Sequence, residues 1–212
     1  MRLDPRPIRP LALALSILLH PLLIPVITLC VAFRLDPHLS YFIEPRSQLI
    51  ILLMVGVMTV VFPLMSIALL WRSGLVSGPT LPLREERTAP YVMTLFYHAM
   101  AYYLMRRSDH DPATFALLTG GMVALMSTLL INLQWKISAH MVGIGGLIGT
   151  LCGLLLLHGT IVPLELAPFI LVAGAIGTAR LLVSDHTPAQ IYVGGAVGFL
   201  STFACVTQEL FV

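Results

Sequence analysis

Charged side chains are scarce in this sequence. Of its 212 residues only 10% are Asp, Glu, Lys or Arg, whereas 58% are hydrophobic, and the mean hydropathy is +0.93. A soluble core cannot hide that much apolar surface, so the composition excludes a soluble globular domain and indicates an integral membrane protein. The net charge is only +2 and no Lys/Arg-rich tract is present, which argues against nucleic acid as a partner.

Cysteine is nearly absent as well. The three thiols, Cys30, Cys152 and Cys205, are scattered through apolar runs. Such isolated cysteines form neither a disulfide framework nor a metal site, and we expect them to be small packing residues. Since no linker or low-complexity segment interrupts the chain, we predict a single integral membrane domain over residues 1–212.

What the sequence does have is a series of long apolar runs. A hydrocarbon layer about 30 Å thick requires about 20 apolar residues per helix, and because lipid cannot satisfy backbone groups, continuous runs of this kind are helical. The first run follows MRLDPRPIRP and imitates a signal peptide, but it lacks a small-x-small cleavage site, so we count it as a span. The prediction is an all-α polytopic bundle of about seven transmembrane helices: Leu11–Phe33, Leu49–Trp71, Pro90–Met105, Ala113–Leu133, His140–His158, Ile161–Val183 and Pro188–Gln208.

Glycines recur every four residues in two of these runs, as Gly145, Gly149 and Gly153 and as Gly194 and Gly198. Small residues at this spacing let membrane helices approach closely. The G-x-G pattern within GIGGLIG lies in mid-span with no preceding strand, so we interpret it as helix packing rather than as a dinucleotide fingerprint.

Threading the runs across a bilayer places three polar segments on one side. These are LREERTAP (83–90), KISAH (136–140) and ARLLVSDHTPAQ (179–190). Each stands next to a helix start, where unpaired amide groups and the helix dipole favour an anion such as phosphate, and each carries a cation. The sequence therefore predicts an anion site at this side of the membrane.

The same segments resemble the type 2 phosphatidic acid phosphatase superfamily of membrane phosphatases. Arg180, five residues and His186 match the spacing of the third motif, with Ala179 where the family has Ser, and ISAH at 137–140 keeps the Ser and His of the second motif. The first motif is looser, because Arg84, Arg87 and Pro90 stand in a different arrangement. At position 190 the family has Asp and this chain has Gln.

The resemblance implies a catalytic role for each residue type. His186 is the expected nucleophile, His140 the acid and base, and Gln190 the group that orients the nucleophilic ring, without the charge of a carboxylate. Asp185 is a neighbour that could supply that charge. The scheme needs no metal or other cofactor, and its phosphate ligands are Arg84, Arg87, Lys136, Ser138 and Arg180.

Each of these residues also has an ordinary structural interpretation. Thr187-Pro188-Ala189-Gln190 fits a helix capping box, which alone explains Gln190. Arg180 fits an interfacial anchor and Lys136 a lysine that snorkels from a helix start. Arg84 and Arg87 fit a solvated loop in which they pair with Glu85 and Glu86.

Two functions follow from the sequence. The first is a membrane phosphatase that takes a lipid phosphate or diphosphate from the bilayer and forms a phosphohistidine, on a six-helix phosphatase-like core. The alternative is a catalytically weak or inactive member of the same fold, which binds anionic lipid or serves as an assembly subunit; a homo-oligomer is compatible with either. Membrane lipids are expected partners and a bacterial inner membrane the expected location.

The charge pattern does not settle which side carries the site. One side holds eight of the twelve cations, but four of them are candidate phosphate ligands, which leaves four against four. The resemblance to bacterial lipid phosphatases favours the periplasmic side. The eight are Arg2, Arg6, Arg9, Arg72, Arg84, Arg87, Lys136 and Arg180.

Overall fold

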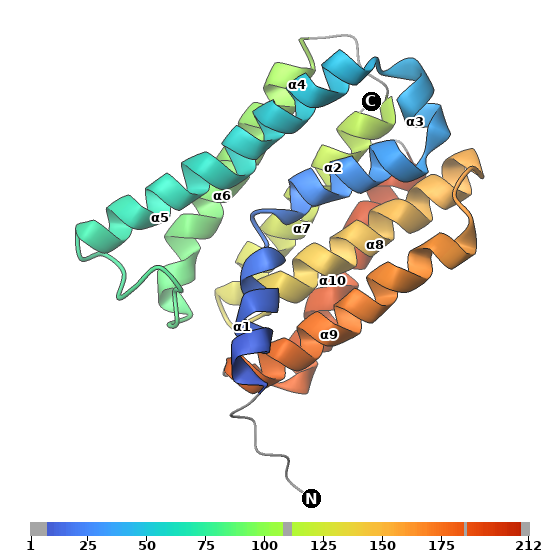
Figure 1. Ribbon diagram of the computed structural model, residues 1–212. Coiled ribbons are helices and arrows are strands. Elements are labelled where there is room, and N and C mark those ends of the chain that lie inside the picture. The colour runs from blue at the N-terminus through green and yellow to red at the C-terminus, as the bar shows by residue number, and fades with distance from the viewer. Residues whose placement is uncertain (1–7, 108–111, 185, 209–212) are drawn as a thin grey trace, which may run out of the picture.

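The computed structural model describes residues 8–107, 112–184 and 186–208, and every regular element within them is a helix (Figure 1). The all-α prediction is confirmed. Five helical segments are long and apolar enough to cross a membrane, so the predicted count of about seven is not confirmed. They are Pro45–Arg72 (α4 and α5), Thr114–Asn132 (most of α7, Pro112–Asn132), Ala139–His158 (α8), Pro163–Val183 (ending in α9, Ala167–Val183) and Pro188–Thr207 (α10).

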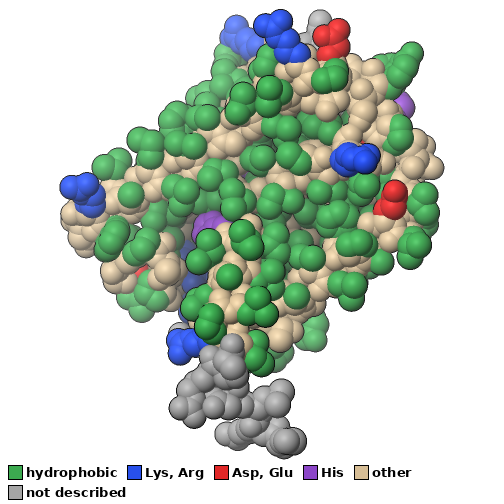
Figure 2. Space-filling model, viewed as in Figure 1, with side chains coloured by type: hydrophobic (Ala, Val, Ile, Leu, Met, Phe, Trp, Pro, Cys, Tyr) green, Lys and Arg blue, Asp and Glu red, His purple; other side chains and the backbone are tan. Residues whose placement is uncertain are grey.

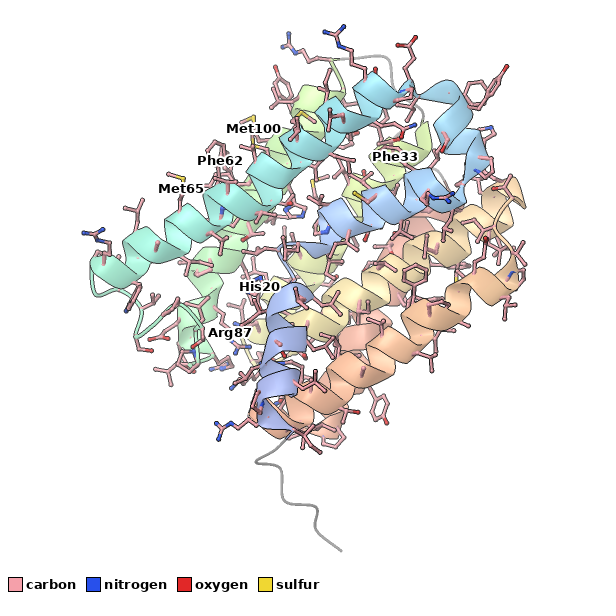
Figure 3. The ribbon with its side chains drawn as sticks, in the orientation of Figure 1. His20, Phe33, Phe62, Met65, Arg87 and Met100 are labelled. Atoms are coloured by element: carbon pink, nitrogen blue, oxygen red, sulfur yellow. The ribbon has the colours of Figure 1, made fainter. Side chains whose placement is uncertain are left out.

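The first apolar run is not one span. It divides into α1 (Arg9–Leu18) and α2 (Ile24–Leu35), so the prediction of a continuous helix over Leu11–Phe33 is wrong. The reason is Pro21, which has no N–H to continue the helix and whose ring clashes with the carbonyl four residues earlier. The break places the half-buried His20 between the two helices (Figure 3).

A second interruption lies opposite the first. The long segment consists of α4 (Pro45–Gly56), one π-helical stretch (Val57–Val61) and α5 (Phe62–Arg72). Pro63 clashes with a regular α-turn, and the wider π-turn accommodates it. The buried Thr59 in this stretch donates a hydrogen bond to the carbonyl of Leu22, 3.4 Å away, so the two interruptions contact each other.

A short polar turn precedes the next helix. A 3₁₀ turn, Glu85–Arg87, leads into α6 (Thr88–Met105), which contains the predicted run Pro90–Met105 but is not among the five long apolar segments. In Figure 1, α4, α5 and α6 lie along one flank, while α2, α8 and α9 lie along the other, joined across the bundle by α7 and α10. The short α3 (Pro37–Phe42) caps the end at which α2 finishes.

The closest helix pair is α8 with α10, and glycine makes it possible. A methyl group on Gly145 would collide with the carbonyl of Gly195, and one on Gly198 would collide with that of Val142. The prediction that these glycines serve packing is confirmed. Their contact aligns the starts of the two helices, where the amide of Ser138 donates to the carbonyl of Gln190 at 3.4 Å.

Candidate functional site at the cation end of an internal cavity

A cavity of about 220 Å³ lies between the α1–α2 break, α2, α6, α7 and α8. Most of its wall is apolar. Figure 2 shows histidine and basic side chains in a hollow of the otherwise largely apolar flank. Figure 3 places His20 and Arg87 there, between the α1–α2 break and the start of α6. The ionisable side chains at this end are His20, Arg87, His140, Arg180 and His186.

Two guanidinium groups reach this end from different helices. Arg87 precedes α6 and donates from Nε to the carbonyl of Leu81 at 2.9 Å, and Arg180 lies in the last turn of α9. The two repel each other electrostatically. Among the described residues, neither forms an ion pair with a carboxylate, and the buried Nε of Arg180 has no hydrogen-bond partner. Two neighbouring cations that have no counter-ion in the described part of the chain form a candidate site for an anion.

The hydrogen bonds of His186 fix its tautomer. The Gln190 Oε1 atom accepts the backbone N–H of Thr187 at 3.1 Å, so it is the amide oxygen, and it lies 3.0 Å from Nδ1 of His186. Because an oxygen of this kind can only accept, Nδ1 carries the proton and the lone pair resides on Nε2. Gln190 therefore closes the capping box, with its own N–H on Thr187 Oγ1 at 3.4 Å, and orients the ring with the same oxygen.

His186 lies in the loop between α9 and α10, and its side chain is buried. Burial lowers its pKa to about 4. The bond to Gln190 opposes this shift, whereas the charges of Arg87, Arg180 and Lys136 add to it. At neutral pH the ring is thus uncharged and keeps the Nε2 lone pair, which a nucleophile requires.

His140 and His20 complete the group. His140, in the first turn of α8, has Nε2 3.0 Å from the carbonyl of Ser16, so Nε2 donates and Nδ1 keeps its lone pair. His20 lies edge-on to it, with ring centroids 5.7 Å apart. Its Nδ1 accepts the N–H of Leu22 at 3.3 Å, which leaves Nε2–H as a donor. His140 also interacts electrostatically with Arg180 and His186.

The structure thus brings together four of the residues named from the sequence, Arg87, His140, Arg180 and His186, with Gln190 behind the last. Three others lie outside the cavity lining. Arg84 contacts the carbonyls of Asn132 and Leu133 and forms an exposed ion pair with Glu85 at 3.0 Å. Lys136 donates to the carbonyl of Pro82 at 3.2 Å. Ser138 is fully buried, and in the described part of the chain its hydroxyl has no partner.

Sequence reasoning missed His20. A histidine inside an apolar run between Pro21 and Leu19 looked like part of a continuous span, although an ionisable residue within a span is itself a sign of function. The pair Pro21 and Pro25 was the available signal, because it predicts a break at that point. Arg2, Arg6 and Asp185, which also entered the sequence argument, lie outside the described residues.

Comparison with known proteins gives no relative: no family model, no curated protein and no solved structure matches this chain. The described residues also contain no cluster of three or more His, Cys, Asp or Glu side chains suited to a metal ion.

Proposed function

We propose that this protein is a membrane phosphatase that hydrolyses a phosphate or diphosphate ester of a lipid through a phosphohistidine on His186. The observation that carries the proposal is the bare Nε2 of His186 in a cavity shared with Arg87 and Arg180. Two cations bind the nonbridging oxygens of phosphate, and a neutral imidazole attacks phosphorus. The apolar wall of the cavity suits a substrate that arrives from the bilayer.

The first step forms the Nε2–P bond on His186 and breaks the bond between phosphorus and the lipid oxygen. The departing oxygen needs a proton. His140 takes up a second proton from solvent as the anionic phosphate binds beside it, and Nδ1 then donates that proton to the lipid oxygen. His20 Nε2–H and the two arginines hold the phosphate oxygens meanwhile. The phosphorylated ring of His186 is positively charged, and Gln190 accepts its Nδ1–H.

The second step releases phosphate. Water attacks phosphorus, the Nε2–P bond breaks, and the water proton passes to the Nδ1 lone pair of His140, which restores both histidines. Gln190 orients the ring but brings no negative charge to stabilise its cationic form. In serine proteases, replacing the Asp that orients the catalytic histidine by an amide lowers the rate about 10⁴-fold. We therefore expect slow turnover.

The amide of Gln190 also favours the second candidate function, in which the same cations and histidines hold an anionic lipid headgroup without hydrolysing it.

For location, the proposal is a bacterial inner membrane with the cavity's cation end on the periplasmic side, supported by the resemblance of the motifs to bacterial lipid phosphatases.

The test is release of inorganic phosphate by detergent-purified protein, without divalent metal, from phosphatidic acid, phosphatidylglycerol phosphate and a polyprenyl diphosphate. His186→Ala removes the nucleophile, so we expect at least a ~1,000-fold loss. His158→Ala is the matched control, because it removes a histidine at the far end of α8. Equal background release by wild type and His186→Ala would contradict the enzyme, and retained lipid binding in that case would select the second function.

A further inference from the structure

The cavity continues well beyond the cation end. Starting from Arg87, just before α6, the lining continues along one face of that helix through Tyr91, Thr94 and His98. On α8 the lining runs from His140 to Thr150. Both helices begin at the cation end. Ten residues of helix rise about 15 Å, so His98 and Thr150 lie at a similar depth, about 15 Å from the cations.

His98 presents an unused acceptor at that depth. Only 3% of the residue is exposed, and its Nδ1 lies 3.0 Å from the carbonyl of Thr94. Nδ1 must donate there, so Nε2 carries a lone pair. Among the described residues no hydrogen bond to Nε2 is present. Gly121 on α7 lies beside the adjacent ring edge, where an added Cβ would stand in van der Waals contact with Cδ2, at 3.8 Å.

Thr150 presents a donor on the opposite wall. It is 1% exposed, and no hydrogen bond of its hydroxyl is found within the described ranges. Two other buried threonines, Thr119 and Thr128, instead donate to the carbonyl four residues earlier, at 3.0 and 2.7 Å. A buried polar group without a partner is unfavourable, and native proteins pair such groups with protein, water or ligand.

We infer that the ligand is a lipid phosphate carrying a hydroxyl group about 15 Å from its phosphate, and that His98 and Thr150 recognise this hydroxyl. A hydroxyl donates one hydrogen bond and accepts another, which matches an acceptor on one wall and a donor on the other. The apolar residues between the two ends enclose the intervening hydrocarbon. The inference rests on the proposed function for the phosphate end of the molecule.

Three single-chain probes test it: dodecyl phosphate, its ω-hydroxy derivative, and the isomer with the hydroxyl beside the phosphate-bearing carbon. An extended chain of a dozen carbons is about 15 Å long, which matches the depth of His98. Binding is measured by ligand-induced thermal stabilisation, and phosphate release is measured in a separate assay. Sites built to bond a hydroxyl discriminate strongly against analogues that lack it, and we expect at least 10-fold tighter binding of the ω-hydroxy probe.

The variants separate recognition from stability. His98→Leu and Thr150→Val each should remove at least a factor of about 5 of this preference, whereas His98→Gln keeps an acceptor near the position of Nε2 and should retain most of it. Thr119→Val, a buried threonine outside the cavity, should leave the preference unchanged. Phosphate release at equal rates from all three probes, with equal binding, overturns the inference and leaves the phosphatase standing. Tighter binding of the ω-hydroxy probe without any phosphate release supports recognition of the hydroxyl and contradicts the phosphatase.

Discussion

Helix α8 carries a histidine at each end, and their surroundings are opposite. At the far end, His158 bonds through Nδ1 to Asp36 at 2.5 Å, and its ring packs on that of His38 with centroids 4.0 Å apart. The carboxylate of Asp36 is fully buried and also accepts from Thr160 Oγ1 at 2.8 Å and from the N–H of His38 at 3.0 Å. At the near end, His140 faces a cavity with Arg180 in electrostatic range.

The difference separates a histidine held by a structural carboxylate from histidines beside cations in a cavity. The carboxylate of Asp36 has three donors around it, and the cluster ties the α2–α3 corner to the end of α8. At the cation end, each histidine lines the cavity and uses one nitrogen to fix its ring, and among the described residues no hydrogen bond to the other nitrogen is present. A histidine–carboxylate pair is the arrangement usually taken as catalytic, yet here it stands at the opposite end of the bundle from the cations.

The largest expected effect comes from removing Asp36, the carboxylate that holds His158. Asp36→Ala removes the buried acceptor that three donors share, and breaking a pair of this kind costs about 3 kcal/mol in the free energy of unfolding. Chemical unfolding in detergent, followed by circular dichroism, measures this. Phosphate release per folded molecule should stay at the wild-type value, because the cluster lies about 27 Å from His140 along α8.

Thr160→Val is a milder variant of the same cluster. It removes one donor and should cost about 1 kcal/mol. A loss of phosphate release per folded molecule in Asp36→Ala comparable to that of His186→Ala would show that both ends of α8 serve the chemistry, and the distinction drawn above would fail.

The fold was largely accessible from sequence where one signal dominated. Apolar runs predicted helices, and the spacing of Gly145, Gly149 and Gly198 predicted the close contact of α8 and α10. The division of the first run was not predicted, because hydropathy averages over a window and treats Pro21 as one residue among many apolar ones. A proline acts locally, by removing one N–H, so its effect appears only when each backbone bond is followed.

The candidate site was accessible in outline only. Sidedness placed Arg87, His140, Arg180 and His186 at one end, but it could not separate Arg87 from Arg84, three residues earlier. The structure directs Arg84 to carbonyls at the end of α7, and such tertiary contacts leave no local pattern in the sequence. For Gln190 the sequence offered a cap or a ring partner as alternatives, and a single oxygen serves as both.

Gln190→Glu sharpens the comparison by giving His186 the carboxylate that His158 has. The pKa of His186 is lowered to about 4, so wild-type kcat/KM that depends on the neutral ring should fall only as the pH drops through about 4. A negative charge at position 190 raises that pKa, so the acid limb should move toward higher pH. At pH 7.5 the ring remains neutral, and stabilisation of its phosphorylated form should raise kcat about 10-fold.

Thr187→Ala is the control, because it removes the hydroxyl of the capping box and leaves the contact between Gln190 and His186 in place. It should cost about 1 kcal/mol of stability and leave the pH profile unchanged. Using one substrate for all variants cancels the titration of the phosphate itself. Superimposable profiles for wild type and Gln190→Glu would mean that the ring of His186 does not ionise or react during turnover.

The smallest expected effect is at Lys136, a cation that lies outside the cavity lining, in contrast to Arg87, which belongs to it. Lys136 acts on His186 through its charge, while its Nζ bonds the carbonyl of Pro82. Lys136→Met should therefore lower kcat/KM by no more than about 3-fold, with most of the difference vanishing at high salt, since exposed charges are screened. Arg87→Met, which removes a guanidinium from the cavity wall, should cost about 100-fold and persist in salt. Equal losses in the two variants would place the bound phosphate nearer to Lys136, outside the cavity, because only there could the two cations contribute alike.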